Sequence, residues 1–163
     1  MDADQIQASL FASCESFRWS ADYAEANLNP MSKLIYPEES YRIRGACFEV
    51  YKLQGCGFTE AIYQECLEAE LEFLGIPFDA QRQFPLLYKG RRLRHTFIPD
   101  LVCFGKILLE LKAASDLTDE HRAQLLNYLQ ASGMHLGFLI NFGHYPKIQI
   151  ERFVNLDGYC GLA

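Results

Sequence analysis

The sequence predicts an α+β domain in which helices flank a mixed, mainly antiparallel sheet. Three segments carry helix-end residues at their limits, and five shorter runs are apolar or alternate apolar and polar residues, as strands do. Along the chain, the order of these segments is two helices, three strands, one helix and two strands. Because strands that follow one another without an intervening helix favour antiparallel pairing, this order indicates an α+β architecture.

Three helices are expected from their end residues. The first spans 37–55, with a proline and two acids in its opening turn and a glycine at its end. The second spans 57–75 and carries an apolar stripe before a glycine and a nearby proline stop it. The third spans 118–133, with a threonine as its cap, two acids in its first turn and a glycine at its end.

Five strands are expected between and after these helices. Turn residues at 89–91 join the first two strands, and Gly105 lies in the turn before the third. The expected strands cover residues 82–88, 92–104, 107–112, 136–141 and 147–154.

The chain of 163 residues is long enough for one compact domain with its own core. Two prolines and several turn-forming residues in 28–40 indicate a boundary, since the periodic part of the chain begins after them. We therefore expect a folded domain at 37–155, an amino-terminal extension at 1–36 and a carboxy-terminal tail at 156–163. The extension is an appended helix or arm, or a start-site extension, and the sequence leaves these alternatives open.

Composition places the chain among globular proteins, because half of its residues are hydrophobic and 22% are charged. Its longest apolar runs are far shorter than the roughly 20 residues of a membrane-spanning helix. Acids also occupy the amino terminus, where a signal peptide carries basic residues. These features predict a soluble, cytoplasmic protein without a membrane partner.

Six cysteines are spread along the chain, and none forms a C-x-x-C pair. Several lie in segments that are expected to be buried. Free thiols in a reducing compartment are therefore expected rather than disulfides or a structural zinc site.

The net charge of −6 gives no overall attraction to nucleic acid. One local run differs: from residue 82 to residue 95 the chain carries five basic side chains and no acid. On charge alone, a solvated hairpin is favoured over a phosphate-binding surface. The basic residues of this run are Arg82, Lys89, Arg91, Arg92 and Arg94.

The stretch "FIPDLVCFGKILLELKAA" at 97–114 places charged residues inside an apolar hairpin. A two-residue turn would mix polar and apolar groups on both faces. A three-residue loop at 104–106 instead puts Asp100 directly across from Glu110 and leaves the opposite face wholly apolar. We expect this second register, with Lys112 on the same face as Glu110.

Two carboxylates directly across a strand pair lie about 5 Å apart at their β-carbons and repel each other. Such a pair persists on a wet face, with a shared proton, or with a cation between its members. Carboxylate oxygens suit Mg²⁺ or Mn²⁺, and the ammonium of Lys112 could orient a water beside the ion. A solvent-exposed strand face with an ordinary Glu–Lys pair is the equal alternative from these residues alone.

The hairpin residues resemble the active-site signature of the PD-(D/E)xK nuclease superfamily. Pro99–Asp100 on one strand and Glu110–Leu111–Lys112 on the next have the order of that signature. No position of the signature is missing. The resemblance alone therefore gives no reason to expect an inactive site.

Three further motifs carry the resemblance beyond the hairpin. "GFTEAIY" at 57–63 fits the G-x-x-E-x-x-Y motif of a small bacterial family in that superfamily. "AQLLNYL" at 123–129 contains the Q-x-x-x-Y pattern of the exonuclease branch, and "GFLINFG" at 137–143 is similar to the strand that follows. The resemblance runs in the expected order from about Glu38 to Val154.

The resemblance implies a restriction-endonuclease-like αβββαβ core and a metal-dependent nuclease acting on DNA, with RNA as the second candidate substrate. Asp100 and Glu110 would be ligands of Mg²⁺ or Mn²⁺, and Glu60 would be an accessory acid at the metal. Lys112 would position or activate the attacking water. Gln124 and Tyr128 would hold the site or the nucleic-acid backbone.

With this resemblance, the basic hairpin gains weight as a nucleic-acid contact, because it leads into the strand of Asp100. Arg91, Arg92 and Arg94 are its candidate contacts. A homodimer or a protein partner is also conceivable. The alternative function is a non-catalytic nucleic-acid- or protein-binding module that keeps the nuclease fold.

Several of these residues have a structural explanation as well. A glutamate at the start of a helix, like Glu60, interacts favourably with the helix dipole. Tyr63 is expected to pack in the core rather than to act in catalysis. Gln124 and Tyr128, one helical turn apart, could hydrogen-bond to each other.

Overall fold

The computed structural model describes residues 35–155 of the chain. The chain divides into two units, Met1–Leu34 and Ile35–Ala163, and the described residues all belong to the second. The expected carboxy-terminal tail at 156–163 and nearly all of the expected amino-terminal extension therefore lie outside the described residues. The proposed division of the chain into domains stays a prediction.

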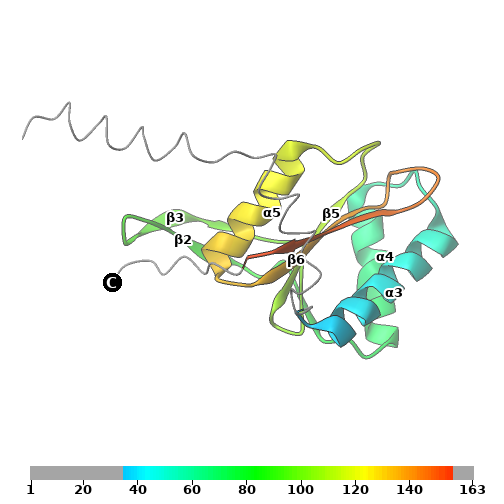
Figure 1. The fold of residues 1–163 in the computed structure, drawn as a ribbon, viewed down its shortest axis with the longest axis horizontal. Coiled ribbons are helices and arrows are strands. Elements are labelled where there is room, and N and C mark those ends of the chain that lie inside the picture. Colours follow the sequence, from blue (N-terminus) through cyan, green and yellow to red (C-terminus); the bar gives the residue numbers. More distant parts are fainter. Residues whose placement is uncertain (1–34, 156–163) are drawn as a thin grey trace, which may run out of the picture. The chain divides into compact units, whose positions relative to one another are not determined.

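Three helices and seven strands make up the described part of the chain (Figure 1). The helices are α3 (Pro37–Gln54), α4 (Glu60–Phe73) and α5 (Asp119–Ser132). The strands are β1 (Phe78–Ala80), β2 (Phe84–Tyr88), β3 (Arg91–Phe97), β4 (Leu101–Cys103), β5 (Ile107–Lys112), β6 (Leu136–Asn141) and β7 (Gln149–Val154).

Five of the strands form one mixed sheet in the order β1-β4-β5-β6-β7. Only β5 and β6 run parallel, and the other three pairs are antiparallel. The α5 helix makes the crossover between the parallel pair, as parallel strands require. This architecture confirms the predicted α+β class with a mainly antiparallel sheet.

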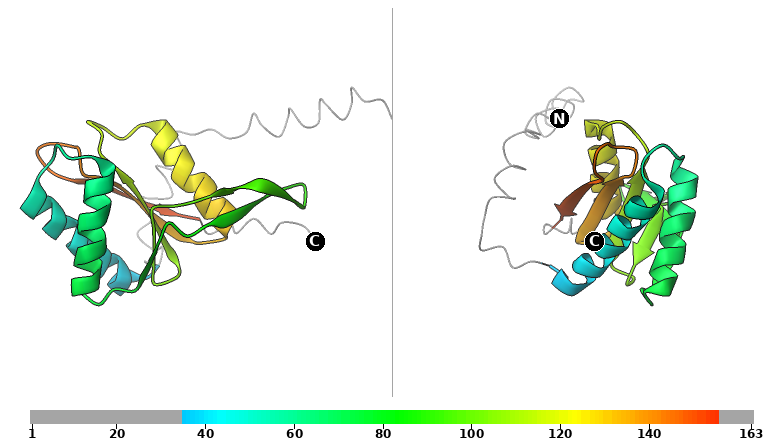
Figure 2. Two further views of the ribbon diagram at one scale, coloured as in Figure 1. Left: turned by 180° about the vertical axis from the view of Figure 1, so that it is seen from behind. Right: turned by 90° about the vertical axis from the view of Figure 1, so that its right-hand side faces the viewer.

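Helices cover both faces of this sheet (Figure 2). One face contributes Leu109 and Phe138 to a core that it shares with α3 and α4. On the other face α5 approaches so closely that a β-carbon at Gly137 would lie 2.9 Å from the side chain of Leu125. No helix within residues 35–155 combines the length and the apolar character that crossing a membrane requires.

The predicted strand at 92–104 is wrong in its extent, because it is two strands in two different sheets. Its first part is β3, which pairs only with β2 in a separate two-stranded sheet, and its second part is β4. The break falls at Ile98–Asp100, where Pro99 has no N–H to give to a strand ladder. The short edge strand β1 was not predicted, since three residues are too few to show a pattern.

The hairpin of β4 and β5 has the register that the sequence predicts. Leu101 pairs with Leu109 and Cys103 with Ile107 across a loop at 104–106. Gly105 has a positive φ of 67° in that loop, as expected. All four paired side chains are buried in the core beneath α3 and α4.

Candidate active site

Asp100 lies just before β4, and the register of the hairpin places it opposite Glu110 of β5. One carboxylate oxygen of Asp100 accepts a hydrogen bond of 2.7 Å from the backbone N–H of Leu111. Burial nevertheless raises the pKa of Asp100, and the bond from Leu111 and the charge of Lys112 only partly offset it. The carboxylate of Asp100 is therefore fixed to the backbone of β5.

Glu110 is almost completely buried, with 3% of its surface exposed. Its Oε1 accepts a hydrogen bond of 2.9 Å from the Lys112 ammonium, whereas its buried Oε2 has no hydrogen-bond partner. Burial and the charge of Asp100 raise the pKa of Glu110 to about 7, despite the bond from Lys112. A buried acceptor without a partner is costly, so Oε2 of Glu110 is a candidate position for a bound group.

The solvent-exposed strand face, which the sequence left open as an alternative, is therefore excluded for Glu110. The two carboxylates do lie on the same face of the hairpin, but α5 packs across that face of the sheet and excludes most water from β5. Asp100, at the strand end, keeps partial exposure. The pair thus has one buried member and one member that solvent can reach.

Lys112 ends β5, and its side chain is 11% exposed. Burial alone lowers the pKa of Lys112, but the hydrogen bond to Glu110 and the charges of Glu110, Glu60 and Asp100 together raise it. The side chain is therefore an ammonium at neutral pH. Its positive charge interacts with the carboxylates of Glu110, Glu60 and Asp100.

Glu60 is the first residue of α4, and the fold brings it to the same strand end. Its Oε1 accepts a hydrogen bond of 3.3 Å from the backbone N–H of Ala113, directly after Lys112. The charge of Glu60 also raises the pKa of both Asp100 and Glu110. Glu60 lies 40 residues before Asp100 in the chain, yet it is close enough to interact with the hairpin residues. These four predicted site residues form the carboxylate cluster, which consists of Glu60, Asp100, Glu110 and Lys112.

Tyr63 is fully buried and holds the start of α4 in place. Its hydroxyl donates to the carbonyl of Gly55 at 2.8 Å and accepts from the N–H of Phe58 at 3.2 Å. Its ring stacks on Phe142, with the ring centroids 4.7 Å apart. The expectation that Tyr63 packs in the core is confirmed, and its hydrogen bonds fix the turn that leads into Glu60.

Asn141, at the end of β6, was not predicted as a site residue. It is fully buried, and its Oδ1 accepts from the N–H of Ala114 and of Gly143, each at 3.0 Å. In addition, the N–H after Asn141 donates to the carbonyl of Lys112 at 2.8 Å. A polar residue that closes the apolar run "LGFLIN" was the sequence signal for this clamp on the end of β5.

Residues 37–153 match the PD-(D/E)XK nuclease superfamily. This match covers more than half of the chain and includes all four clustered residues. The chain belongs to the PD-(D/E)XK nuclease superfamily. Pro99–Asp100 and Glu110–Leu111–Lys112 have the residue types that the superfamily's name describes.

Among solved structures, the chain is similar to the crystal structure of SSO0001. The two share 19% sequence identity with a TM-score of 0.49, over 61% of this chain and 52% of that chain. The matched part therefore spans about half of that protein's length. No protein with a curated description matches the chain.

The carboxylates of this cluster have the chemistry that a hard divalent cation prefers. Within residues 35–155 no group of three or more His, Cys, Asp and Glu side chains forms a complete metal site. Mg²⁺, however, is commonly held by one or two carboxylates and otherwise by water and substrate phosphates. The unpartnered oxygen of Glu110 beside Asp100 fits that kind of partial site.

Gln124 and Tyr128 lie on α5 and bond to each other rather than to the carboxylates. The Gln124 amide donates to the Tyr128 hydroxyl at 3.1 Å, as the structural explanation expects. The Tyr128 ring stacks on Phe97 of β3, with centroids 4.7 Å apart. The pair therefore joins the base of the β2–β3 hairpin to α5.

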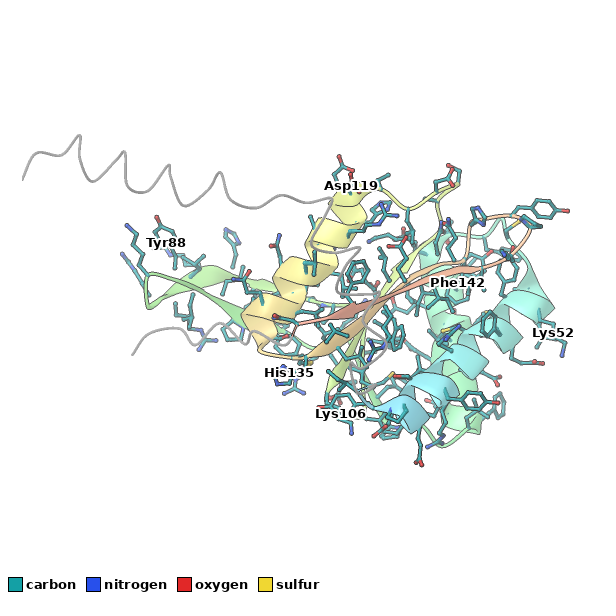
Figure 3. All side chains as sticks on the ribbon, viewed as in Figure 1. Lys52, Tyr88, Lys106, Asp119, His135 and Phe142 are labelled. Carbon is teal, nitrogen blue, oxygen red and sulfur yellow. The ribbon has the colours of Figure 1, made fainter. Side chains whose placement is uncertain are left out.

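The predicted nucleic-acid contacts Arg91, Arg92 and Arg94 are all on β3 and are exposed. Figure 3 labels Tyr88, next to the turn of the same hairpin, at its outer end, away from the body of the domain. The arginines are thus not part of the carboxylate cluster. They occupy a separate surface on β3, the strand that precedes Asp100 in the chain.

Proposed function

We propose that the chain is a Mg²⁺- or Mn²⁺-dependent nuclease that hydrolyses phosphodiester bonds in DNA, with RNA as the second candidate substrate. The observation that carries this proposal is the unpartnered Oε2 of Glu110, buried beside Asp100 and Lys112 in a member of a nuclease superfamily. We further propose that the chain belongs to the G-x-x-E-x-x-Y family within it. Residues 57–63 support that narrower assignment.

Asp100 and Glu110 would hold the metal ion, with Glu60 as an accessory acid at the edge of the site. A bound divalent ion supplies positive charge for the phosphate and makes hydroxide available near neutral pH. The protein's own contribution is to fix the carboxylates. Leu111 holds Asp100 through its N–H, and Lys112 holds one oxygen of Glu110, which leaves the other oxygen available to the ion.

Lys112 would stabilise negative charge that develops on the scissile phosphate and orient the attacking water. A raised pKa keeps this side chain protonated at neutral pH, so in this state it donates hydrogen bonds rather than accepting a proton. Preorganised positive charge in a site that excludes water is worth more than the same charge in bulk solvent. Lys112 meets that condition because only 11% of its side chain is exposed.

The nucleic acid would reach this site over the surface of α5 and β3. Gln124 and Tyr128 are partly exposed on α5, and Arg91, Arg92 and Arg94 are exposed on β3. Positive side chains attract the phosphate backbone independently of its sequence. We assign these five residues to substrate binding and not to the chemical step.

Cleavage of labelled DNA in the presence of Mg²⁺ or Mn²⁺ tests the proposal. Wild type should cleave, whereas Asp100→Ala and Lys112→Ala should not, and both variants should melt as cooperatively as wild type. Asp119→Ala and Lys52→Ala are the matched controls, because these side chains lie on α5 and α3 and are 82% and 72% exposed. Activity that survives both site substitutions would remove the basis of the proposal.

The alternative is a binding module that keeps the fold without cleaving. The exposed arginines of β3 favour it, since they lie apart from the carboxylates and need no metal to attract phosphate. This alternative predicts salt-sensitive DNA binding that Asp100→Ala leaves unchanged. It also predicts no cleavage of single-stranded, duplex or branched substrates with any divalent metal.

A further inference from the structure

Strands β2 and β3 and the turn between them form a two-stranded ribbon, here called the basic ribbon (residues 84–97). At its base Phe97 is buried and stacks on Phe84 and on Tyr128, with centroids 5.1 and 4.7 Å apart. Beyond that base nearly every residue is exposed, whichever face it occupies. A ribbon that leaves both faces in solvent has an unusual amount of free backbone and side-chain surface.

The outer half of the basic ribbon has positive charge that no acid neutralises. No Asp or Glu occurs from residue 80 to residue 99. Four basic residues lie at or near the turn, and within residues 35–155 none of them takes part in an ion pair. They are Lys89, Arg91, Arg92 and Arg94.

Both faces of the basic ribbon carry this charge. Cross-strand partners share a face, and neighbours along a strand point to opposite faces. The register pairs Arg91 with Tyr88 and Arg92 with Leu87. Each face therefore ends in one arginine beside one apolar side chain, and Tyr88 and Leu87 are 64% and 68% exposed.

We infer that the basic ribbon inserts into the major groove of duplex DNA, and that double-stranded DNA is the substrate class of the proposed nuclease. The inference rests on the proposed function. The major groove, about 12 Å wide, admits a two-stranded ribbon, and phosphates on both sides of the groove would face the two charged faces. Leu87 and Tyr88 would then contact base edges, including thymine methyl groups.

Other nucleic acids match this surface less well. A single strand is usually bound on one face by a row of stacking aromatic rings, whereas Tyr88 alone among Phe, Tyr and Trp is exposed on the described basic ribbon. Duplex RNA has a deep, narrow major groove that side chains cannot read. A second copy of the chain would bring like charges together at a two-fold axis.

The length of the basic ribbon gives the inference a measurable scale. Nine residues lie between Gly90 at the turn and Asp100 at the carboxylate cluster, so the chain makes ten residue steps from one to the other. An extended chain of that length spans at most about 33 Å. Since each base pair adds about 3.4 Å along the duplex, the contacts of the turn would lie within about ten base pairs of the cleaved bond.

Binding of fluorescein-labelled nucleic acids to the full chain in EDTA tests the inference by fluorescence anisotropy. The probes are a DNA duplex of about three helical turns, its single strand and the corresponding RNA duplex. We expect the DNA duplex to bind at least about tenfold more tightly than the other two. The charge-removing variant Arg91→Ala/Arg92→Ala should lower the salt slope of duplex binding by about 1.8.

The matched control is Arg44→Ala/Lys52→Ala, which removes the same charge from exposed positions of α3. It should leave the salt slope unchanged. Equal losses in the two double variants would overturn the inference, as would equal or tighter binding of the single strand or the RNA duplex. Absence of binding to every probe would overturn it as well, and melting curves would check that both variants fold.

A second measurement separates this inference from the proposed function. The binding assay contains no metal, so it tests the basic ribbon separately from cleavage. If the DNA duplex binds through the ribbon but no divalent ion supports cleavage, only the proposed function fails. Conversely, metal-dependent cleavage that Arg91→Ala/Arg92→Ala does not weaken would overturn the ribbon inference alone. In an active protein, removal of DNA beyond about ten base pairs from the cleaved bond should not change binding.

Discussion

The carboxylate cluster and the basic ribbon are opposite kinds of surface in one domain. Glu110 is 3% exposed, and hydrogen bonds from Leu111, Lys112 and Ala113 fix the carboxylates of Asp100, of Glu110 itself and of Glu60. The ribbon arginines are exposed and form no ion pair with any described residue. Chemistry on a phosphate needs fixed groups in a site that excludes water, whereas long-range attraction to nucleic acid needs charge in solvent.

The largest effect is expected at the rigid cluster. Asp100→Asn removes a charge while keeping the shape of the side chain, so cleavage should fall by roughly 10²–10³-fold. Metal-free DNA binding should stay near that of wild type, because the phosphate contacts are assigned to the other surface. Asp119→Asn is the control for loss of one carboxylate. Cleavage rates and anisotropy on the same samples measure both properties, and equal loss of binding and cleavage would contradict the separation.

Tyr63→Phe tests whether the support of the cluster matters as much as its charged groups. The substitution keeps the ring that stacks on Phe142 but removes the hydrogen bonds to Gly55 and Phe58. The free energy of unfolding should therefore fall by about 1–3 kcal/mol. Because this turn leads into Glu60, cleavage should fall more than DNA binding does. Chemical denaturation and kcat against KM measure the two effects, with Tyr41→Phe, 82% exposed, as the control.

Glu110→Gln should stabilise the metal-free protein while abolishing cleavage. The pKa of Glu110 is raised from 4.5 to about 7, so the folded protein holds this proton more tightly than the unfolded chain does. The stability that the proton contributes is complete below pH 4.5 and is lost as the pH rises to about 7.

Near pH 8, glutamine should therefore raise the free energy of unfolding of the metal-free protein by about 1–3 kcal/mol. Mg²⁺ should raise the melting temperature of wild type but not that of the variant. Thermal melts in EDTA and in Mg²⁺ measure both effects. A variant that is less stable than wild type near pH 8 would contradict the argument from burial.

The smallest effect on stability is expected on the basic ribbon. Leu87 is 68% exposed, so Leu87→Ser should change the free energy of unfolding by no more than about 0.5 kcal/mol. Duplex DNA binding should nevertheless weaken, because the leucine is assigned to base edges in the groove. Denaturation and anisotropy together check this result. Leu53→Ser, at a leucine 67% exposed on α3, is the matched control and should leave binding unchanged.

The sequence was a good guide wherever one local pattern decides the structure. The ends of the helices follow from glycine, proline and capping residues, and the register of β4 and β5 follows from keeping Asp100 and Glu110 off an otherwise apolar face. The sequence was a poor guide where a strand finds its partners in distant parts of the chain. The break at Pro99 separates two strands that look continuous, and the clamp by Asn141 depends on β6 lying beside β5.

The sequence by itself determined the α+β class, the superfamily signature and the residue types at the strand ends. Alternation along a strand and spacing around a turn act over a few residues, so they can be read without the fold. Only the tertiary structure decided that Glu60 meets the end of β5 at Ala113, that Glu110 loses its water beneath α5, and that Asn141 holds the same strand end. Burial and charge interaction depend on neighbours that the linear order leaves far apart.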